Sequence, residues 1–224
     1  MISIAIDGPS GAGKSTIART LAAQLGFIYV DTGAMYRAIG LYVLRAGGDP
    51  ADERFVIPCL EDITVTISYQ DGRQRMFLNG EDVSEEIRRP ECSMAASGVS
   101  AIPEVRQFLL GQQRDIAEKQ DCIMDGRDIG TVVLPDATLK IFLTASPEDR
   151  AGRRYKELTA KGFHMDFEEL LDEIEKRDYN DANRATAPLR QAEDAVLVDT
   201  TGNTLEQSIA QLTALVKEKL HDCL

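Results

Sequence analysis

Short apolar runs alternate along this chain with stretches of helical periodicity, and the order predicts a parallel sheet covered by helices. Turn or helix-capping residues follow each apolar run, and a helix-like segment comes next. We predict five core strands, at residues 2–7, 28–31, 122–125, 139–144 and 195–199. The predicted fold class is therefore α/β, with a five-stranded parallel sheet and helices on both of its faces.

Helix start signals lie between the predicted strands. Ser146 followed by Pro147 is typical of an N-cap and a first helical residue. Asn203 and Glu206 have the spacing of a capping box, which places the start of the last helix at 203. One face of that helix carries an apolar stripe made of Ile209, Leu212, Val216 and Leu220.

One segment breaks the alternation of strand and helix. Residues 63–69 alternate apolar and polar side chains, and Asp71-Gly72 then turns the chain into 73–79, which is typical of a β-hairpin. Helix-like segments at 34–46 and 103–119 flank the hairpin. We interpret about 60–90 as an antiparallel subdomain inserted into a single core, because no long linker separates the two.

A glycine-rich segment follows the first strand directly. Gly8-Pro9-Ser10-Gly11-Ala12-Gly13-Lys14-Ser15 completes the pattern G-x-x-x-x-G-K-S. Such a loop points backbone N–H groups at one anion, while its lysine reaches the β- and γ-phosphates and its hydroxyl faces Mg²⁺. Thr16 leads into a helix whose N-terminal dipole attracts phosphate. A chance glycine-rich turn would need neither the apolar strand before it nor the helix after it. We therefore predict a nucleoside triphosphate site.

A second polar cluster, 31–37, follows the second predicted strand, and ligands gather at the carboxyl ends of parallel strands. In one interpretation Thr32 and Arg37 face a phosphate acceptor. In the other, Asp31 and Thr32 cap an ordinary helix and Arg37 lies on its solvated face. The cluster alone does not decide between them.

A third cluster, 125–130, follows the third predicted strand. Asp125 stands where phosphate-loop enzymes often carry a carboxylate directed at the metal, and Arg127 can give two parallel hydrogen bonds to phosphate. A glycine-containing turn could also produce such a cluster. Three neighbouring strand ends with phosphate chemistry favour a functional site.

Two groups of charged residues have helical spacing. They are Arg150, Arg153 and Arg154 on one helix, and Arg177, Asp181 and Arg184 at the end of another. Acidic neighbours leave open that the first group lies on a solvated face. The short glycine-containing stretch 160–163 suggests instead a lid that closes over the triphosphate.

Composition narrows the partners of the protein. The formal net charge of −12 over 224 residues argues against a nucleic-acid surface, which needs a basic stripe. The sequence carries no apolar run long enough to span a membrane, and we expect a cytoplasmic protein. Cys59, Cys92, Cys122 and Cys223 are scattered and only two histidines occur, so we expect reduced cysteines and no structural zinc.

Four motifs together resemble the bacterial cytidylate kinases, a family of the nucleoside monophosphate kinase class. They are 6–15, 31–37, 125–133 and the pair 177–178 with 183–185. The resemblance spans nearly the whole chain and implies one phosphate-loop kinase domain. It implies a core at about 1–33, 100–146 and 190–224, a monophosphate-binding insertion at about 34–99, and a lid region at about 150–185.

The resemblance implies ATP-dependent phosphorylation of CMP and dCMP to the diphosphates by direct in-line transfer, in pyrimidine nucleotide metabolism. Mg²⁺ is the implied cofactor, and we expect a monomer with ATP and CMP or dCMP as its small-molecule partners. No covalent intermediate is needed, because the acceptor phosphate oxygen is already a nucleophile at neutral pH. Positioning and charge neutralisation then carry the reaction.

Motifs and resemblance together assign individual residues. For ATP they are Gly8, Pro9, Ser10, Gly11, Ala12, Gly13, Lys14, Ser15, Thr16, Arg150 and Arg153. For CMP they are Thr32, Arg37, Ser97, Arg106, Arg127, Asp128, Arg177, Asp181 and Arg184. For catalysis they are Lys14, Arg37, Arg127, Arg154 and Arg184, and for the metal Ser15 with Asp125 through water.

Two other classes of protein remain open from the sequence. A shikimate-type kinase would share the phosphate loop and an Asp-Thr pair after the second strand, but neither the hairpin insertion nor the Asp-Gly-Arg-Asp turn is expected in it. A nucleotide-binding regulatory module would bind ATP without a phosphate acceptor.

Overall fold

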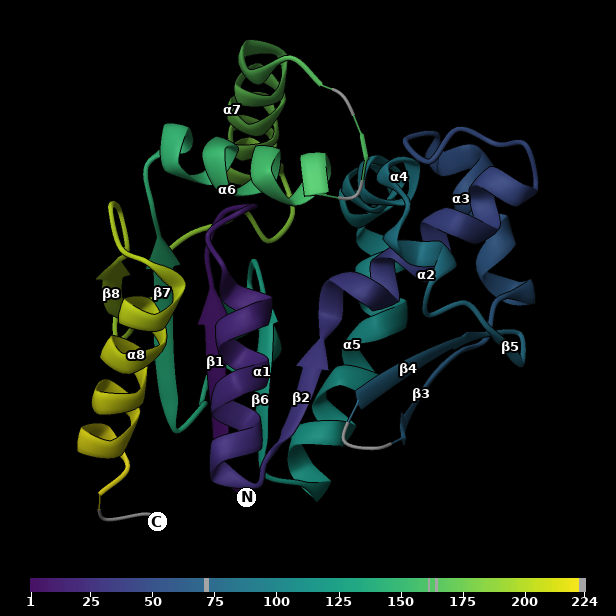
Figure 1. The fold of residues 1–224 in the computed structure, drawn as a ribbon. Helices are drawn as coiled ribbons and strands as arrows, with labels where there is room; N and C mark the ends of the chain where they lie inside the picture. Colours follow the sequence, from purple (N-terminus) through teal and green to yellow (C-terminus); the bar gives the residue numbers. More distant parts are fainter. Residues whose placement is uncertain (71–72, 161, 164, 222–224) are drawn as a thin grey trace.

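The computed structural model describes residues 1–70, 73–160, 162–163 and 165–221. Its centre is a five-stranded sheet in the order β2-β6-β1-β7-β8, in which every pair of neighbours is parallel (Figure 1). The strands are β1 (Ser3–Asp7), β2 (Ile28–Asp31), β6 (Cys122–Gly126), β7 (Leu139–Thr144) and β8 (Val196–Asp199). The predicted α/β class and all five predicted strands are confirmed, with ends that shift by at most one residue.

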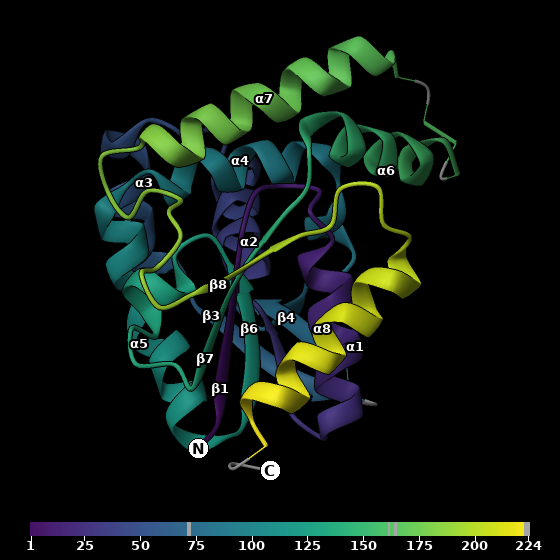
Figure 2. The same ribbon diagram turned by 90° about the vertical axis from the view of Figure 1, so that its left-hand side faces the viewer.

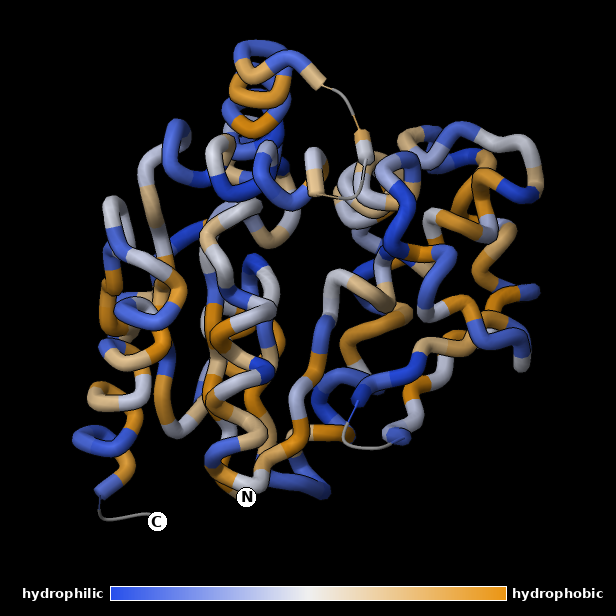
Figure 3. Tube along the Cα trace, viewed as in Figure 1, coloured by the Kyte–Doolittle hydropathy of each residue, from blue (hydrophilic) through white to orange (hydrophobic). Residues whose placement is uncertain are grey.

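Helices cover both faces of this sheet because its strands point apolar side chains alternately to either side. Ile4 and Ile6 pack toward α1 (Lys14–Leu25) and α8 (Leu205–Lys219), which lie together in Figure 2. The intervening Ala5 packs on the other face, with the end of α5 (Pro103–Lys119) and a π-helical turn, η3 (Ile129–Val133). Figure 3 shows the apolar residues concentrated along these central strands.

The last helix has the predicted apolar stripe but begins one residue later than predicted. Leu212, Val216 and Leu220 are buried in the core, and Ile209 packs against it. The capping box consists of Thr204 and Gln207 rather than Asn203 and Glu206. The Thr204 hydroxyl accepts from the Gln207 backbone N–H and the Gln207 side chain reaches back to the Thr204 N–H, whereas the Asn203 amide donates to Gln211.

The inserted segment forms its own small sheet and apolar core. The predicted hairpin is confirmed: β3 (Val65–Gln70) and β4 (Arg73–Leu78) pair antiparallel, and β5 (Glu81–Asp82) adds a third strand. The predicted turn at Asp71-Gly72 lies outside the described residues. Helix α2 (Thr32–Arg45) packs against this sheet, together with elements that the sequence pattern did not predict. These are α3 (Glu53–Cys59), η1 (Leu60–Asp62), η2 (Glu86–Arg88) and α4 (Pro90–Ser100).

Side chains of the hairpin form hydrogen bonds with backbone groups at the outer edge of the main sheet. Strand β2 lies at the end of the strand order, so its outward N–H and C=O groups have no neighbouring strand. The Tyr69 hydroxyl donates to the Tyr29 carbonyl at 3.1 Å. The Gln74 amide accepts from the Asp31 N–H at 2.8 Å and donates to the Asp31 carbonyl at 3.3 Å. The insertion is thereby attached to the strand end that carries Asp31.

Two helices, α6 (Pro147–Ala160) and α7 (Phe167–Asn183), pack together above the carboxyl edge of the sheet (Figure 1). The start of α6 at Pro147 agrees with the predicted Ser146-Pro147 signal. Of the predicted lid stretch 160–163, Lys161 lies outside the described residues. Among the described cysteines, Cys59, Cys92 and Cys122 are free; Cys223 is outside that part of the chain. Within the described residues, every helix is too short or too polar to cross a membrane.

We predict that Gln74→Ala lowers the free energy of unfolding by about 1–2 kcal/mol, because it leaves two backbone groups of β2 without their partner. Urea unfolding measures the loss. Gln107→Ala, at an exposed position of α5, serves as the control and should change stability by less than about 0.5 kcal/mol. Equal effects of the two variants would show that the hairpin does not stabilise the edge of β2.

Candidate active site

The predicted phosphate loop connects β1 to α1 and curls tightly against β7. Gly8 has a φ of 147°, and a Cβ at this position would overlap the Leu143 carbonyl oxygen, so only glycine is accommodated. Gly13 is the N-cap of α1 and carries no side-chain capping bond. The first backbone N–H groups of α1 are therefore free of a side-chain cap, as in helix termini that bind phosphate.

Lys14, Ser15 and Asp125 meet at the start of α1. The Lys14 ammonium is buried and donates to the Pro9 carbonyl at 2.7 Å, while the Ser15 hydroxyl donates to Asp125 Oδ2 at 2.8 Å. Burial, with a further contribution from Arg127, lowers the pKa of Lys14 well below its usual value. Burial and the nearby Asp31 raise the pKa of the Asp125 carboxyl to about 6.

The donor atoms beside Lys14 suit Mg²⁺. Ser15 and Asp125 supply hydroxyl and carboxylate oxygens, the hard ligands that Mg²⁺ takes together with water and substrate phosphates. Within the described residues, His, Cys, Asp and Glu side chains do not form any group of three that could hold a metal by themselves. The residues present therefore fit a Mg²⁺ that also binds phosphate oxygens.

Arginines from three elements converge on the same edge of the sheet as Lys14. Arg37 pairs with Asp31 at 2.8 Å, and Arg127 pairs with Asp181 at 2.8 Å. The Nε atoms of Arg37 and Arg177 are buried and have no hydrogen-bond partner in the described structure. Burial, together with Arg127, lowers the pKa of Arg177 to about 10. Buried arginines with unused N–H donors are suited to binding a phosphate anion.

The hydrogen bonds confirm that Asp31 caps a helix and exclude a solvated Arg37, whereas contact with a phosphate acceptor stays a prediction. Asp31 is the N-cap of α2 and accepts from the Ala34 N–H at 2.9 Å, while its other oxygen holds Arg37. Arg37 does not lie on a solvated helix face, because only 23% of its side chain is exposed. The buried Thr32 hydroxyl donates to the Asp125 carbonyl at 2.8 Å. Asp31 therefore both caps the helix and orients Arg37.

A second charged group lies beside this cluster. Asp128 is buried and accepts from Arg106, and its other oxygen lies 3.5 Å from Arg184. The Arg106 guanidinium also lies over the Tyr36 ring, 5.5 Å from its centroid. Arg184 is the C-cap of α7 and donates to the Ala187 carbonyl, so it follows the helix rather than lying within it. Ser97 is half-buried on α4, the helix that packs against α2.

The three arginines of α6 differ in burial and in their partners. Arg150 is buried and donates to the carbonyls of Ala145 and Ser10, at 2.9 Å and 3.0 Å, and pairs with Asp178 at 2.5 Å. Arg153 donates to the carbonyl of Thr200 at 2.7 Å and to that of Ala12 at 3.4 Å. Arg154 pairs with Glu157 near the surface. The first two therefore hold the backbone of the phosphate loop and its surroundings.

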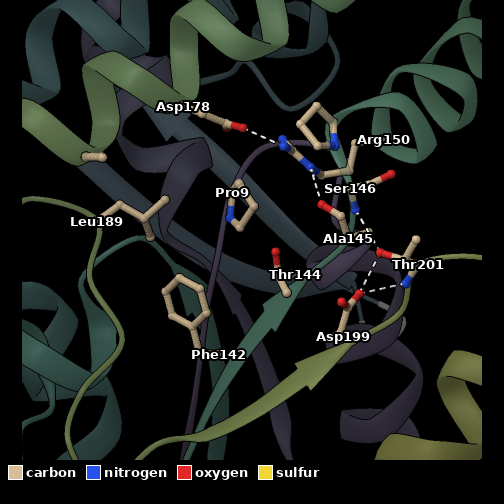
Figure 4. Close-up of a pocket in the computed structure, with 12 residues that line it drawn as sticks. Pro9, Phe142, Thr144, Ala145, Ser146, Arg150, Asp178, Leu189, Asp199 and Thr201 are labelled. Carbon is tan, nitrogen blue, oxygen red and sulfur yellow. Dashed lines mark hydrogen bonds and ion pairs between the residues drawn. The ribbon is translucent and has the colours of Figure 1, made fainter.

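A cavity of about 500 Å³ lies beneath α6 and α7, where β7 and β8 end. Pro9 and Leu189 line it with Phe142, and Thr144, Arg150 and Asp178 add polar groups (Figure 4). The Arg150–Asp178 ion pair at its wall joins α6 to α7, as the dashed line in Figure 4 shows. Because Arg150 also donates to the Ser10 carbonyl, this ion pair links both helices to the phosphate loop.

Asp7, to which the sequence analysis assigned no role, organises the site from the end of β1. Its two carboxylate oxygens accept from the backbone N–H groups of Ile129 and Gly130, at 2.8 Å and 2.7 Å. The segment that carries Arg127 and Asp128 is thereby attached to the strand that carries the phosphate loop. In the sequence, Asp7 is marked only by its position directly before the phosphate loop, and an acidic residue there also suits an ordinary turn.

The parallel sheet, the glycine loop between β1 and α1, and the buried lysine with its serine–aspartate pair define a phosphate-loop kinase. The family model described as Cytidylate kinase matches residues 4–218, so the chain belongs to the cytidylate kinase family. It is thus an enzyme of the nucleoside monophosphate kinase class. This membership excludes the shikimate-type kinase and the regulatory module that the sequence had left open.

Relatives agree with this assignment, and a solved structure shares the fold. The cytidylate kinase of Caldicellulosiruptor bescii is 55% identical, with 96% of this chain and 95% of the relative covered. That of Caldanaerobacter subterraneus is 53% identical, with 97% and 95% covered. A crystal structure of an uncharacterized protein from Eubacterium ventriosum shares the fold, with a TM-score of 0.54, 12% identity, and coverage of 97% of this chain and 98% of that one.

We predict that protonation of Asp7 stabilises the fold. Burial raises the pKa of Asp7 to about 6, well above the usual value of an aspartate, so the folded protein binds this proton more tightly than the unfolded chain. Stability relative to Asp7→Asn should therefore rise by about 2 kcal/mol as the pH falls from about 7.5 to about 4.5. Denaturant unfolding of both proteins across this range measures the difference, and a constant difference would contradict the prediction.

Proposed function

We propose that this enzyme transfers the γ-phosphoryl group of ATP to CMP and dCMP, forming CDP and dCDP. The observation that carries the proposal is the convergence of Lys14, Arg37, Arg127 and Arg177, in which the Nε atoms of Arg37 and Arg177 are buried without a hydrogen-bond partner in the described structure. The phosphates of a donor triphosphate and an acceptor monophosphate would supply partners for these N–H groups. The names of the relatives support CMP as the acceptor.

On the donor side, residues 8–16 would surround the triphosphate, with Lys14 at the β- and γ-phosphates. Ser15 and Asp125 would hold Mg²⁺, directly or through water, and the bound ion would neutralise phosphate charge. Arg150 and Arg153 would act on ATP indirectly, because their donors already engage the carbonyls of Ser10 and Ala12. This revises their predicted role as direct ATP ligands.

On the acceptor side, Arg37 and Arg127 are oriented by Asp31 and Asp181, which supports a clamp that is formed before the substrate arrives. Arg184 would complete this clamp. Asp181 and Arg177 would then contact the sugar.

The base would be recognised by Ser97, Arg106 and Asp128. Arg106 and Asp128 form a buried ion pair, and Ser97 lies on α4, which packs on α2 and α5. Buried polar groups of this kind discriminate among bases because the wrong base leaves them without partners. We assign Ser97, Arg106 and Asp128 to cytosine on this ground, with Thr32 positioning the strand end that leads to them.

Direct in-line transfer follows from these positions. The acceptor phosphate oxygen attacks the γ-phosphorus, and cations from both sides stabilise the charge on the transferring group. Movement of α6 and α7 would bring Arg154 toward the phosphates and exclude water. Monomeric state, cytoplasmic location and a role in pyrimidine nucleotide metabolism stay predictions from the sequence.

We predict ADP release from Mg-ATP with CMP and dCMP, and much slower release with other nucleoside monophosphates. Lys14→Ala should lower turnover by at least about 100-fold, because it removes a charge that stabilises the transition state. A coupled ADP assay across a panel of monophosphates measures both. ADP release that does not depend on any acceptor would contradict the proposal, as would normal turnover in a folded Lys14→Ala protein.

We predict that Arg127→Met lowers kcat/KM for CMP by about 10²–10³-fold while the affinity for ATP changes little. The variant keeps an unbranched apolar stem but removes the guanidinium and its charge-assisted contacts. Steady-state kinetics and ATP titration separate the two effects. Arg54→Met, at an exposed position of α3, is the matched control. Comparable losses in ATP affinity and CMP turnover would show that Arg127 serves the donor or the fold.

A further inference from the structure

Tyr29, in the core strand β2, forms a hydrogen bond with the Asp125 carboxylate, which we propose as a ligand of Mg²⁺. Tyr29 is 8% exposed, and its hydroxyl donates to Asp125 Oδ1 at 2.9 Å. A phenol is protonated at neutral pH, so this hydroxyl is a hydrogen-bond donor.

Each oxygen of the Asp125 carboxylate accepts a hydrogen bond from a different side chain. Tyr29 donates to Oδ1, and the Ser15 hydroxyl donates to Oδ2 at 2.8 Å. Rotation of the carboxylate about its last torsion would break both bonds, so the pair defines its plane. Since the Ser15 proton points to Asp125, the lone pairs of the Ser15 oxygen face away from the carboxylate and stay available to a cation.

The position of Tyr29 is itself well supported. Its ring belongs to the apolar core beside α1, and the Arg19 guanidinium lies 5.6 Å from the ring centroid. Its backbone carbonyl accepts from the Tyr69 hydroxyl of the hairpin at 3.1 Å. A packed ring could serve the fold alone, but packing does not require a hydroxyl that ends on a buried carboxylate.

We propose that Tyr29 is a positioning residue for the metal site. The Tyr29 hydroxyl holds the Asp125 carboxylate so that Asp125 Oδ2 and the Ser15 hydroxyl present one oxygen-rich face to Mg²⁺. The inference rests on the proposed function, in which Ser15 and Asp125 hold Mg²⁺. Groups that orient a metal ligand from behind typically change metal affinity or activity by about 10–100-fold when removed. Tyr29 is expected to act at the lower end of this range, because Ser15 still holds one oxygen of the carboxylate.

The test measures metal binding separately from turnover. Mn²⁺ is titrated into the complex of the protein with ADP, and free Mn²⁺ is measured by its electron paramagnetic resonance signal. Tyr29→Phe keeps the ring and removes only the hydroxyl, and we expect it to weaken Mn²⁺ binding by about 10-fold. The Mg²⁺ concentration that gives half-maximal kinase activity should rise by a similar factor, while affinity for ADP without metal and KM for CMP stay unchanged.

Two further variants separate the possible outcomes. Tyr69→Phe removes a hydroxyl that contacts the backbone of the same Tyr29 but not Asp125, and it should bind Mn²⁺ like the unchanged protein. Asp125→Asn should weaken Mn²⁺ binding more than Tyr29→Phe does. Thermal melting confirms that each variant is folded.

Each alternative result has a distinct meaning. Normal Mn²⁺ binding by Tyr29→Phe, with weakened binding by Asp125→Asn, would overturn the role of Tyr29 and leave the metal site intact. Normal binding by Asp125→Asn would overturn the metal assignment of the proposed function itself. Equal weakening by Tyr29→Phe and Tyr69→Phe would show that strand β2 is merely destabilised, which also overturns the inference.

Discussion

Repulsion among buried cations is the constraint on which the rest of this structure depends. Lys14, Arg37, Arg127 and Arg177 share one edge of the sheet, and burial combined with mutual repulsion lowers the pKa values of Lys14 and Arg177. An arrangement of this kind costs stability in the free protein and is compensated when phosphate binds. The surrounding fold therefore has to hold the cations in place against their own repulsion.

Carboxylates and backbone carbonyls provide this restraint. Asp31 holds Arg37 and Asp181 holds Arg127, yet neither partner satisfies the whole guanidinium, as the unpartnered Nε of Arg37 shows. Each arginine is thus oriented while part of its hydrogen-bonding capacity stays available. Preorganised charge is effective because the protein does not have to reorganise during phosphoryl transfer.

Several supports connect this site to distant parts of the chain. Asp7 ties the end of β1 to the turn after β6, and Gln74 ties the hairpin to Asp31. Arg150 connects the phosphate loop to both α6 and α7 through Ser10 and Asp178. The insertion and this helix pair are therefore tied directly to the residues of the candidate site.

The sequence by itself determined the sheet, the hairpin and the phosphate loop, because these depend on local patterns: apolar runs, period-two alternation and glycines at fixed spacing. It missed the short helix α3, which contains Pro58, and placed the last N-cap at Asn203 instead of Thr204. Only the tertiary structure decided which donors of Arg150 and Arg153 are occupied, and that Asp7 and Tyr29 support the site. Those contacts join residues about 100 or more positions apart, as in Tyr29 with Asp125, and no local spacing encodes them.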